Sequence, residues 1–415
     1  MKYKFNSSFN YSLAYNILNA IFPLLTVPIV LRVFSSQQYG EYIFVNVVYQ
    51  IFNTLFVLSV QPFFIREFIR KVESGISEAV CLSENLSLQL WMSISSSLLY
   101  IALMLLLIYL DATKISLSVI FLFPVIFLFL NFEWYFYATQ KYKEIFYRSL
   151  FVKLSVLIAI MLCVNDESSL IIYVSIMSGS YLLNNLIGFV FISPCIHISL
   201  IFKGNSSLFG FIFKARNFIA SSSIGVCYQY IDQLLVGLFL SKSELAALSI
   251  LKQLFNVSVM LPTTVCRLWL PASVAKKSNM DRLCNIKRNM KIYGVLVVSI
   301  FSGLMLTGVT VLEYIATAKY SFSIIDVALC ALCVLVTSTA VFVDTQVSIP
   351  NDLERITTVS NSIVLISFSL SIVPLTLSFG YLGPVAALFF SELLGVSVMI
   401  YMHVFKYKTH IHRDK

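Results

Sequence analysis

Charged residues are scarce in this sequence. Asp, Glu, Lys and Arg make up 12% of the 415 residues, about half of the ~25% that soluble domains carry. No such residue occurs between Ile356 and Ser391, and the stretches 85–110 and 168–202 also lack them. A helix needs about 20 apolar residues to cross the hydrocarbon core of a bilayer. The scarcity of charged residues therefore excludes a protein whose whole surface faces water, and it indicates a membrane protein.

The short motifs of common enzymes are also missing. The sequence contains no Gly-x-x-x-x-Gly-Lys-[Ser/Thr] phosphate loop and no His-Glu-x-x-His zinc motif. Only four histidines are present, and three of them lie from His403 onward, where the His410-x-His412 pair is expected to be solvated. The longest predicted loop, 193–216, is too short for a catalytic domain. These absences predict that the chain is not an enzyme.

The eight cysteines give no disulfide pattern, because most of them lie within apolar segments. Cys330-x-x-Cys333 has the spacing of a redox or metal-binding pair. The same spacing also places two small apolar residues one turn apart on a membrane helix, which is the interpretation that we favour. No metal site is predicted.

What the sequence has in abundance is long apolar runs, with 59% hydrophobic residues and a mean hydropathy of +0.87. Only helices and closed barrels satisfy every backbone group in lipid, and barrel strands alternate in polarity over about 10 residues. The runs here are apolar on all sides for about 20 residues. They predict twelve transmembrane helices at 11–31, 42–65, 85–110, 115–139, 146–164, 169–192, 217–240, 245–271, 292–312, 324–349, 356–379 and 383–405.

The N-terminal run is predicted to be the first of these helices rather than a cleaved signal peptide. Lys2 and Lys4 precede it, as they would in a signal. However, the apolar stretch from Tyr11 to Leu31 is longer than a signal core, and no small-x-small cleavage site follows it.

The basic residues are distributed unevenly between the two sides that these twelve spans define. Of the 29 Lys and Arg, 22 fall on the side of the termini and 4 on the opposite side. Because cytoplasmic loops carry the excess of Lys and Arg, both termini are predicted to be cytoplasmic. This topology also accounts for the net charge of +9, so no nucleic-acid partner is predicted.

Two segments of the chain resemble each other. The segment from Phe34 to Tyr42, between the first two helices, is similar to the segment from Leu240 to Leu248, between the seventh and eighth, at an offset of 206 residues. Two parallel six-helix halves are typical of transporters that bind substrate near the midplane, at the interface of the repeats. The predicted domains are an N-terminal lobe at 1–192, a cytoplasmic linker at 193–216, a C-terminal lobe at 217–405 and a basic tail at 406–415.

Three basic residues lie well inside predicted spans, beyond their first turn. An ionised side chain at the bilayer centre costs about 2.5–3.5 kcal/mol on insertion scales, so it usually faces a cavity or a partner. Lys153, Lys252 and Arg267 therefore predict a cationic chamber for an anionic substrate, with Arg32 at its outer rim. The alternatives are snorkelling to the membrane surface or pairing with a buried carboxylate.

Acidic residues also occur within the spans. Asp232, Asp344 and Glu392 are candidates for binding a proton or a sodium ion, and Glu133 is a weaker one. A cation-coupled transporter needs such a group, because one charge crossing the membrane potential supplies about 2.3 kcal/mol per 100 mV. The alternative for Asp232 is a salt bridge to Lys252.

Three segments are similar to a known family. They are Asn19 to Tyr42, with Pro23, Pro28 and a Tyr-Gly-Glu-Tyr entry to the second helix; Glu133-Trp-Tyr-Phe-Tyr-Ala-Thr-Gln-Lys-Tyr-Lys143 after the fourth helix; and Phe379-Gly-Tyr-Leu-Gly-Pro-Val-Ala-Ala387 followed by Glu392. Together they resemble the O-antigen flippases, in the polysaccharide-exporter branch of the multidrug/oligosaccharidyl-lipid/polysaccharide (MOP) exporter superfamily. In the second segment, Tyr137 and Ala138 replace the family's Gln-Gly, and Gln140 replaces its Glu.

The resemblance implies an all-helical fold of two six-helix lobes around a central cavity. It implies alternating access and a substrate of undecaprenyl-pyrophosphate carrying a sugar repeat unit, in the inner membrane of a bacterium. It also implies a cation site among the seventh, eleventh and twelfth helices, on which Asp232, Asn361 and Glu392 lie. No cofactor is implied beyond a proton or sodium gradient. A polysaccharide polymerase and chain-length proteins are candidate partners.

Two other functions remain open at this stage. A cation-coupled exporter of small drugs on the same fold would have a compact chamber with carboxylates and few bases. A non-transporting membrane scaffold of a polysaccharide assembly complex would have its intramembrane charges paired with one another.

Overall fold

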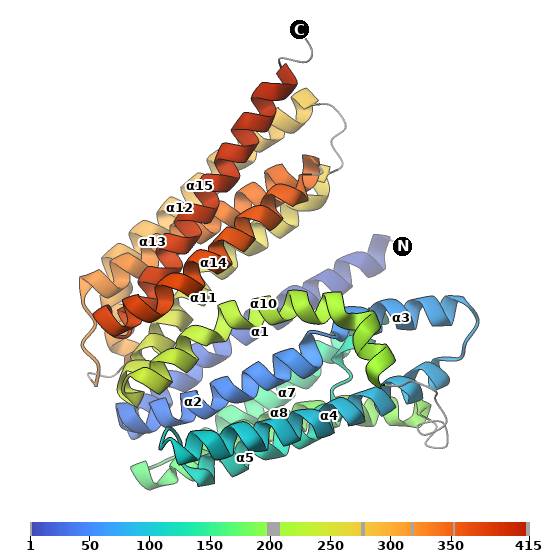
Figure 1. Ribbon diagram of the computed structural model, residues 1–415, viewed down its shortest axis with the longest axis vertical. Coiled ribbons are helices and arrows are strands. Elements are labelled where there is room, and N and C mark those ends of the chain that lie inside the picture. Colours follow the sequence, from blue (N-terminus) through green and yellow to red (C-terminus); the bar gives the residue numbers. More distant parts are fainter. Residues whose placement is uncertain (1, 197–207, 275–278, 317–318, 352, 412–415) are drawn as a thin grey trace. The chain divides into compact units, whose positions relative to one another are not determined.

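The computed structural model of the protein describes residues 2–196, 208–274, 279–316, 319–351 and 353–411 (Figure 1). Helices dominate this part of the chain, which contains no β-strand. The contacts divide the chain into two compact units, residues 1–238 and 239–415. The predicted fold class, an all-helical membrane protein, is confirmed, whereas the lobe boundaries given above stay a prediction. Residues 197–207 of the predicted linker and 412–415 of the predicted tail lie outside the described residues.

The first unit contains the helices that correspond to the first seven predicted spans. They are α1 (Lys2–Val33), α2 (Ser36–Asn53) continued by a π-helical turn η1 (Thr54–Leu58) and α3 (Gln61–Glu73), α4 (Glu78–Tyr109), α5 (Ile115–Ile126) with a 3-10 turn η2 (Phe127–Leu130) and α6 (Glu133–Ala138), α7 (Tyr142–Cys163), α8 (Leu170–Ile192) between short turns η3 (Glu167–Ser169) and η4 (Ser193–Cys195), and α10 (Leu208–Phe239).

The second unit contains the helices of the remaining spans. They are α11 (Lys242–Val274), α12 (Asn279–Ala316), α13 (Ile324–Val343) continued by a π-helical turn η5 (Asp344–Ser348) and a 3-10 turn η6 (Ile349–Asn351), α14 (Glu354–Phe379) and α15 (Leu382–Ile411). Eleven helices in the described residues are long and apolar enough to cross a membrane. A twelfth, α10, lies where the seventh span is predicted.

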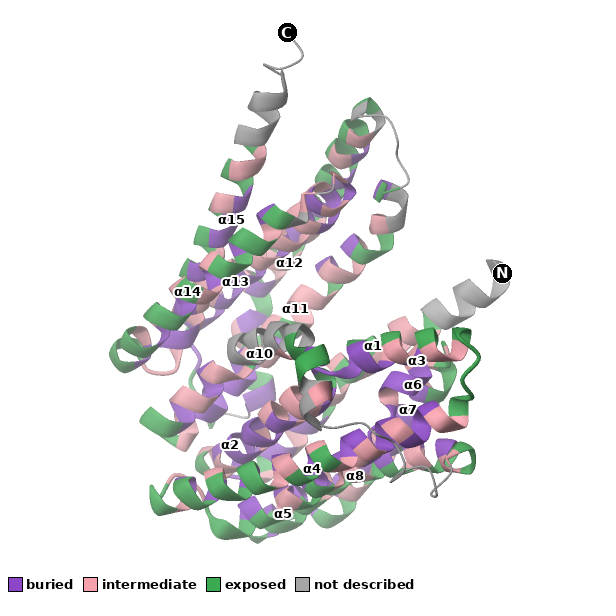
Figure 2. Cartoon of the chain, turned by 45° about the vertical axis from the view of Figure 1, so that its right-hand side comes forward, coloured by how far each residue is buried: buried purple, intermediate pink, exposed green. Residues whose placement is uncertain are grey.

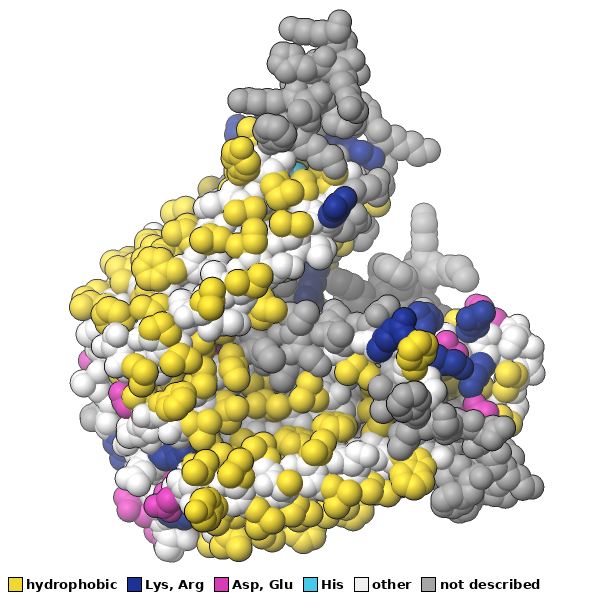
Figure 3. Space-filling model, viewed as in Figure 1, with side chains coloured by type: hydrophobic (Ala, Val, Ile, Leu, Met, Phe, Trp, Pro, Cys, Tyr) yellow, Lys and Arg dark blue, Asp and Glu magenta, His cyan; other side chains and the backbone are white. Residues whose placement is uncertain are grey.

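The surface of each unit is apolar along the helices. On α4, for example, Trp91, Leu98 and Leu105 are each more than half exposed. In Figure 2 exposed residues recur along the faces of α4 and α5, and in Figure 3 hydrophobic side chains cover the helices on the visible face. Soluble proteins rarely expose such contiguous apolar surface. The protein is therefore a multi-pass membrane protein whose helices face lipid.

The two segments that resemble each other in sequence also form the same local structure. Ser35 caps α2, and its side chain and backbone N–H exchange hydrogen bonds with Gln38. Ser241 caps α11 and exchanges the equivalent hydrogen bonds with Glu244. Each pair is a capping box, in which the side chain at N3 and the capping hydroxyl satisfy each other's backbone N–H groups. The shared structure at the offset of 206 residues supports the predicted internal repeat.

A turn built on glycine joins the last two helices. Gly380 has a φ of +60°, a conformation that side-chain-bearing residues rarely adopt. A Cβ on Gly383 would lie 2.2 Å from the carbonyl oxygen of Leu375, so no larger residue fits there. Tyr381 in this turn donates a hydrogen bond to Asp326 at the start of α13. Burial, followed by the contact with Asp326, raises the pKa of the Tyr381 phenol and keeps it protonated.

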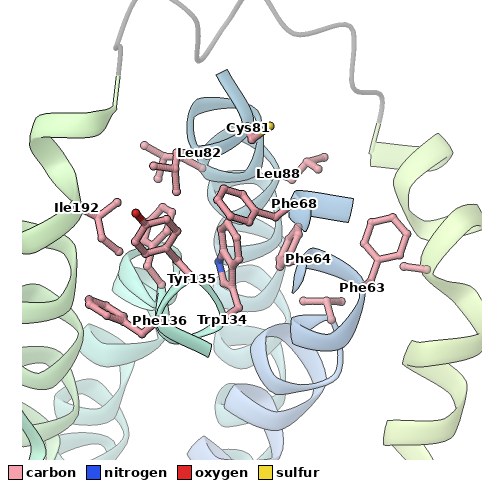
Figure 4. Packing of buried hydrophobic residues seen from close by; sticks show 14 of the residues in the cluster. Phe63, Phe64, Phe68, Cys81, Leu82, Leu88, Trp134, Tyr135, Phe136 and Ile192 are labelled. Atoms are coloured by element: carbon pink, nitrogen blue, oxygen red, sulfur yellow. The ribbon is translucent and has the colours of Figure 1, made fainter. Parts of the chain in front are cut away.

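Aromatic side chains pack together at one end of the first unit, where α6 contacts α3. Trp134 on α6 is fully buried, and its ring contacts Phe64, Phe68 and Phe132 at centroid distances of 5.5–5.8 Å. Figure 4 shows the rings of Phe64, Phe68 and Trp134 lying next to one another. The cluster fixes α6, and thereby the start of α7, which carries the basic residues described next.

Candidate functional site in the first unit

Lys153 lies near the middle of α7 and reaches toward α1. Its Nζ donates a hydrogen bond of 2.6 Å to Oδ1 of Asn19 and lies 3.5 Å from the carbonyl oxygen of Leu18. The same Nζ is 4.9 Å from the centre of the Phe22 ring. The ammonium is thus held by neutral groups only, an amide, a carbonyl and an aromatic face.

No salt bridge joins Lys153 to any carboxylate within the described residues. Salt bridges of Arg66, Lys71 and Lys114, by contrast, involve partly exposed side chains. Lys153 itself is half-buried. A cation that keeps its full charge at membrane depth attracts an anion strongly, because the low local dielectric weakens screening. Within the described residues Lys153 thus forms no structural ion pair, and its role in a substrate chamber stays a prediction.

The face of α1 that receives Lys153 is fixed by a carboxylate on α6. Tyr15, one turn before Asn19, donates a hydrogen bond of 3.0 Å to Oε1 of Glu133. Tyr137 donates to the same oxygen at 3.2 Å. Two phenolic donors orient Glu133, and they place Asn19 opposite Lys153. Glu133 therefore positions α1 against α6 and α7.

Arg148 is a second buried cation of α7 that the sequence reasoning missed. Only 7% of its surface is exposed, and its Nε has no hydrogen-bond partner. Its guanidinium lies 5.3 Å from the centre of the Phe136 ring. Arg148 is one of the 22 basic residues counted on the side of the termini, although the predicted span already begins at residue 146. Gly188 on α8 was the available signal, since glycines mark close approach between membrane helices.

The other basic residues predicted from the sequence are spread over several helices. Lys252 is half-buried on α11, in the second unit. Arg267, about four turns further along α11, is exposed, as is Arg32 near the end of α1. The contacts of Lys153 with Leu18, Asn19 and Phe22 all lie inside the first unit. The assignment of the other three residues to a substrate chamber stays a prediction.

The predicted cation-coupling residues also lie on different helices. Asp232 on α10 is buried and accepts a hydrogen bond from the backbone N–H of Gln233, its neighbour in the chain. Asp344 opens the π-helical turn η5 and accepts a hydrogen bond of 2.7 Å from Thr357 of α14. Asn361, one turn beyond Thr357, is exposed, and Glu392 on α15 is half-buried. No group of three or more His, Cys, Asp or Glu in the described residues is arranged to hold a metal ion.

A buried amide network in the second unit was also missed. Gln346, within η5, accepts hydrogen bonds from Ser273 and Asn289 and donates one to the carbonyl of Cys266. Asn285 extends the network by donating to Ser273. The sequence reasoning singled out Asp344 in the Asp-Thr-Gln-Val-Ser run and passed over Gln346. Gln346 and the α12 residues Asn285 and Asn289 are neutral, so they do not stand out in the sequence as a charged residue within an apolar run does. The π-helical turn that contains Gln346 is visible only in the structure, and such turns often mark functional positions.

Solved structures of other proteins show the same fold. The chain matches "Lipid II flippase MurJ, inward closed conformation" with a TM-score of 0.66 and 12% identity over 95% of this chain and 87% of that one. It matches an inward-facing multidrug resistance MATE family transporter of the MOP superfamily with a TM-score of 0.64 and 11% identity over 94% and 95% of the two chains. The eukaryotic MATE transporter AtDTX14 matches with a TM-score of 0.52 and 15% identity over 97% and 95%. The fold is therefore that of the MOP-superfamily flippases and transporters.

The sequence itself specifies the family. Residues 7–276 match the family model described as polysaccharide biosynthesis protein. The match covers more than half of the chain, so this protein belongs to that family. No curated protein sequence matches it. The resemblance drawn from the three sequence segments is confirmed at the level of the family, and the solved structures confirm the fold.

Proposed function

We propose that the protein is a flippase that moves an undecaprenyl-pyrophosphate-linked oligosaccharide, an O-antigen repeat unit, from the cytoplasmic to the periplasmic leaflet of a bacterial inner membrane. In this proposal both termini are cytoplasmic, transport follows an alternating-access cycle, and no covalent step occurs. Membership of the polysaccharide biosynthesis family and the flippase fold support it.

The observation that carries the proposal is the uncompensated charge of Lys153. Its contacts with Asn19, Leu18 and Phe22 orient the ammonium without neutralising it. A pyrophosphate presents several anionic oxygens, and a charge-assisted hydrogen bond to such a group is roughly twice as strong as a neutral one. An uncompensated lysine is therefore suited to a pyrophosphate headgroup.

The same charge opposes the two rival functions. An exporter of cationic drugs would be expected to hold carboxylates at this depth rather than an uncompensated lysine, because like charges repel in a low dielectric. A scaffold without transport would gain nothing from the cost of an uncompensated charge in the membrane, which is about 2.5–3.5 kcal/mol on insertion scales. We propose that Lys153 offsets this cost by binding the transported anion.

Deletion of the gene in its host tests the proposal directly. We expect lipid-linked repeat units to accumulate on the inner leaflet, because their synthesis continues while their transport stops. Accessibility of the sugars to a lectin or a glycosidase in sealed, oriented vesicles measures the leaflet. A plasmid copy of the gene should restore the normal distribution. An unchanged distribution in the deletion strain would eliminate the flippase function, and altered drug sensitivity alone would favour the exporter.

Cation coupling is tested at Asp232, for which we propose a role in binding a proton or sodium. The substitution Asp232→Asn preserves the shape of the side chain and its ability to accept a hydrogen bond from Gln233, but it removes the titratable group. In proteoliposomes, we expect the variant to lose the acceleration of flipping that an imposed cation gradient produces. Asp326→Asn is the matched control, because Asp326 lies outside the proposed coupling set, where Ser323 and Tyr381 donate to it. Undiminished, gradient-dependent flipping in Asp232→Asn would rule out the assignment.

A further inference from the structure

A pocket opens on the surface of the first unit between α7 and α8. Its volume is about 560 Å³, and it is lined by Lys143, Glu144, Tyr147, Arg148, Phe151, Ile187 and Phe191. A volume in this range accommodates a compact polar headgroup. The lining combines charged residues from the first turns of α7 with aromatic residues from both helices, so the pocket has a polar part and an apolar rim.

Arg148 has no counter-ion in this pocket. Glu144 lies four residues earlier on the same helix, the spacing at which a carboxylate and a guanidinium normally pair. Nevertheless, no salt bridge joins the two, and Arg148 forms none with any other described carboxylate. Its Nε is buried without a hydrogen-bond partner. Burial of a cation without a partner costs free energy unless a bound anion neutralises its charge.

Close helix packing holds the guanidinium in place. A Cβ on Gly188 of α8 would lie 2.2 Å from Nη1 of Arg148, so a larger residue there would displace the end of the Arg148 side chain. The Phe136 ring lies beneath the guanidinium, at 5.3 Å from Cζ. The position of Arg148 is thus defined by neutral neighbours, and Lys143 and Arg148 together outweigh the single negative charge of Glu144 in the pocket lining.

An exposed apolar stripe leads away from the pocket along α7. Tyr147, Phe151, Leu154 and Ile158 are each at least half exposed, and Met161 and Leu162 continue the series. From residue 147 to residue 162 the helix rises about 22 Å at 1.5 Å per residue, and one leaflet of the hydrocarbon core is about 15 Å thick. An acyl chain that starts at the pocket therefore finds apolar surface along its whole length.

We propose that this pocket binds the phosphate of an anionic membrane phospholipid, with Arg148 contacting the phosphate and the exposed stripe of α7 receiving an acyl chain. Charge complementarity specifies the anionic headgroup, and the aromatic rim and the stripe specify a lipid rather than a free ion. Lys153, whose ammonium contacts Asn19 of α1, is not among the residues that line this pocket. The bound lipid supplies the counter-ion that the chain itself lacks.

The proposal is tested by native mass spectrometry of the purified full-length protein in detergent, titrated with phosphatidylglycerol or with phosphatidylcholine of the same chain length. We expect the wild-type protein to bind phosphatidylglycerol preferentially. Arg148→Gln should weaken this binding about tenfold, because the charge-assisted hydrogen bonds of one guanidinium are lost. Equal binding of the two lipids by the wild-type protein would overturn the proposal.

Two glycine variants of α8 keep the test independent of the folding of Arg148→Gln. Gly188→Ala retains every charge but displaces the end of the Arg148 side chain, so it should weaken phosphatidylglycerol binding by a similar factor. Gly179→Ala lies on the same helix with nothing within 4 Å of the added methyl group, and it should bind like the wild-type protein. Unaltered binding by Gly188→Ala, or displacement of the lipid by millimolar inorganic phosphate alone, would contradict a lipid site.

The result is distinguishable from the proposed transport activity. Lipid binding is measured on the isolated protein without any flipping assay, and it predicts nothing about the leaflet distribution of the lipid-linked sugar. A protein that binds phosphatidylglycerol through Arg148 but does not transport repeat units would retain this inference and lose the proposed function. A protein that transports repeat units but does not bind phosphatidylglycerol through Arg148 would retain the proposed function and lose this inference.

Discussion

Substitution of Lys153 by glutamine is expected to reduce flipping about 10- to 100-fold while leaving the protein inserted in the membrane. The estimate follows from the loss of one hydrogen bond between charged groups, worth about 1.5–3 kcal/mol, where each 1.4 kcal/mol corresponds to a factor of ten. Lys153 is suited to this contact because only Asn19, Leu18 and Phe22 surround its ammonium. The measurement is the initial rate of translocation of the lipid-linked sugar in proteoliposomes.

Asn19 provides a second way to test the charge without removing the lysine. In Asn19→Asp a carboxylate would replace the amide oxygen that now lies 2.6 Å from Nζ. The new ion pair would neutralise Lys153, so we expect a loss of flipping comparable to that of Lys153→Gln. Asn19→Ala leaves the charge in place and should retain most of the activity. A purely structural role for the lysine would produce the opposite order.

A matched control for the lysine is available at the surface. Lys114 forms a salt bridge of 2.8 Å with Glu41, and its side chain is largely exposed. Exposed ion pairs contribute about 0–1 kcal/mol, so Lys114→Gln should transport at the wild-type rate. If Lys153→Gln and Lys114→Gln transport equally well, Lys153 has no part in substrate binding.

The double substitution of Lys153 and Lys252 is expected to abolish export completely.

The spans could be predicted from the sequence because the membrane imposes one simple requirement, a helix about 20 residues long that is apolar on every side. The structure has helices at each of the twelve predicted positions. Their ends could not be predicted, since α12 begins at Asn279 rather than near residue 292, and α15 continues to Ile411. Charged residues end an apolar run but do not end a helix, because they continue it in the interfacial region.

Interruptions inside the helices were also beyond sequence reasoning. The π-helical turn Thr54–Leu58 and the 3-10 turn Phe127–Leu130 consist mainly of apolar residues that are equally compatible with a regular helix. Packing against neighbouring helices decides their conformation. By contrast, the capping residues Ser35 and Ser241 have side chains that act locally, so the internal repeat was recognisable from the sequence.

The residues of the candidate site also differ in whether the sequence alone could predict them. Lys153 was predicted because a charge far inside an apolar run is anomalous on its own. Arg148 was not, because it lies near the end of the run and only its contacts with Gly188 and Phe136 show that it is buried. The neutral partners of Lys153 could not be predicted either. Which side of α1 faces α7 depends on tertiary packing, and the sequence of α1 is apolar on most sides.

The aromatic cluster around Trp134 is expected to give the largest effect on stability. In Trp134→Ala the removal of a fully buried indole leaves a cavity lined by Phe64, Phe68 and Phe132. Such substitutions cost about 3–5 kcal/mol in soluble proteins. Association of helices in lipid relies on packing rather than on exclusion of water, so we expect a cost at the lower end, about 3 kcal/mol. Reversible unfolding in mixed micelles measures it.

Two variants separate packing from the other properties of tryptophan. The indole Nε1 of Trp134 is buried without a hydrogen-bond partner, so Trp134→Phe loses no hydrogen bond and should cost far less than the alanine variant. Trp91 is a tryptophan on the exposed face of α4, where lipid fills the space that its removal creates. Trp91→Ala should therefore leave the free energy of unfolding almost unchanged. Equal destabilisation by Trp91→Ala and Trp134→Ala would show that the cluster does not hold α3, α4 and α6 together, and that the start of α7 is positioned by other contacts.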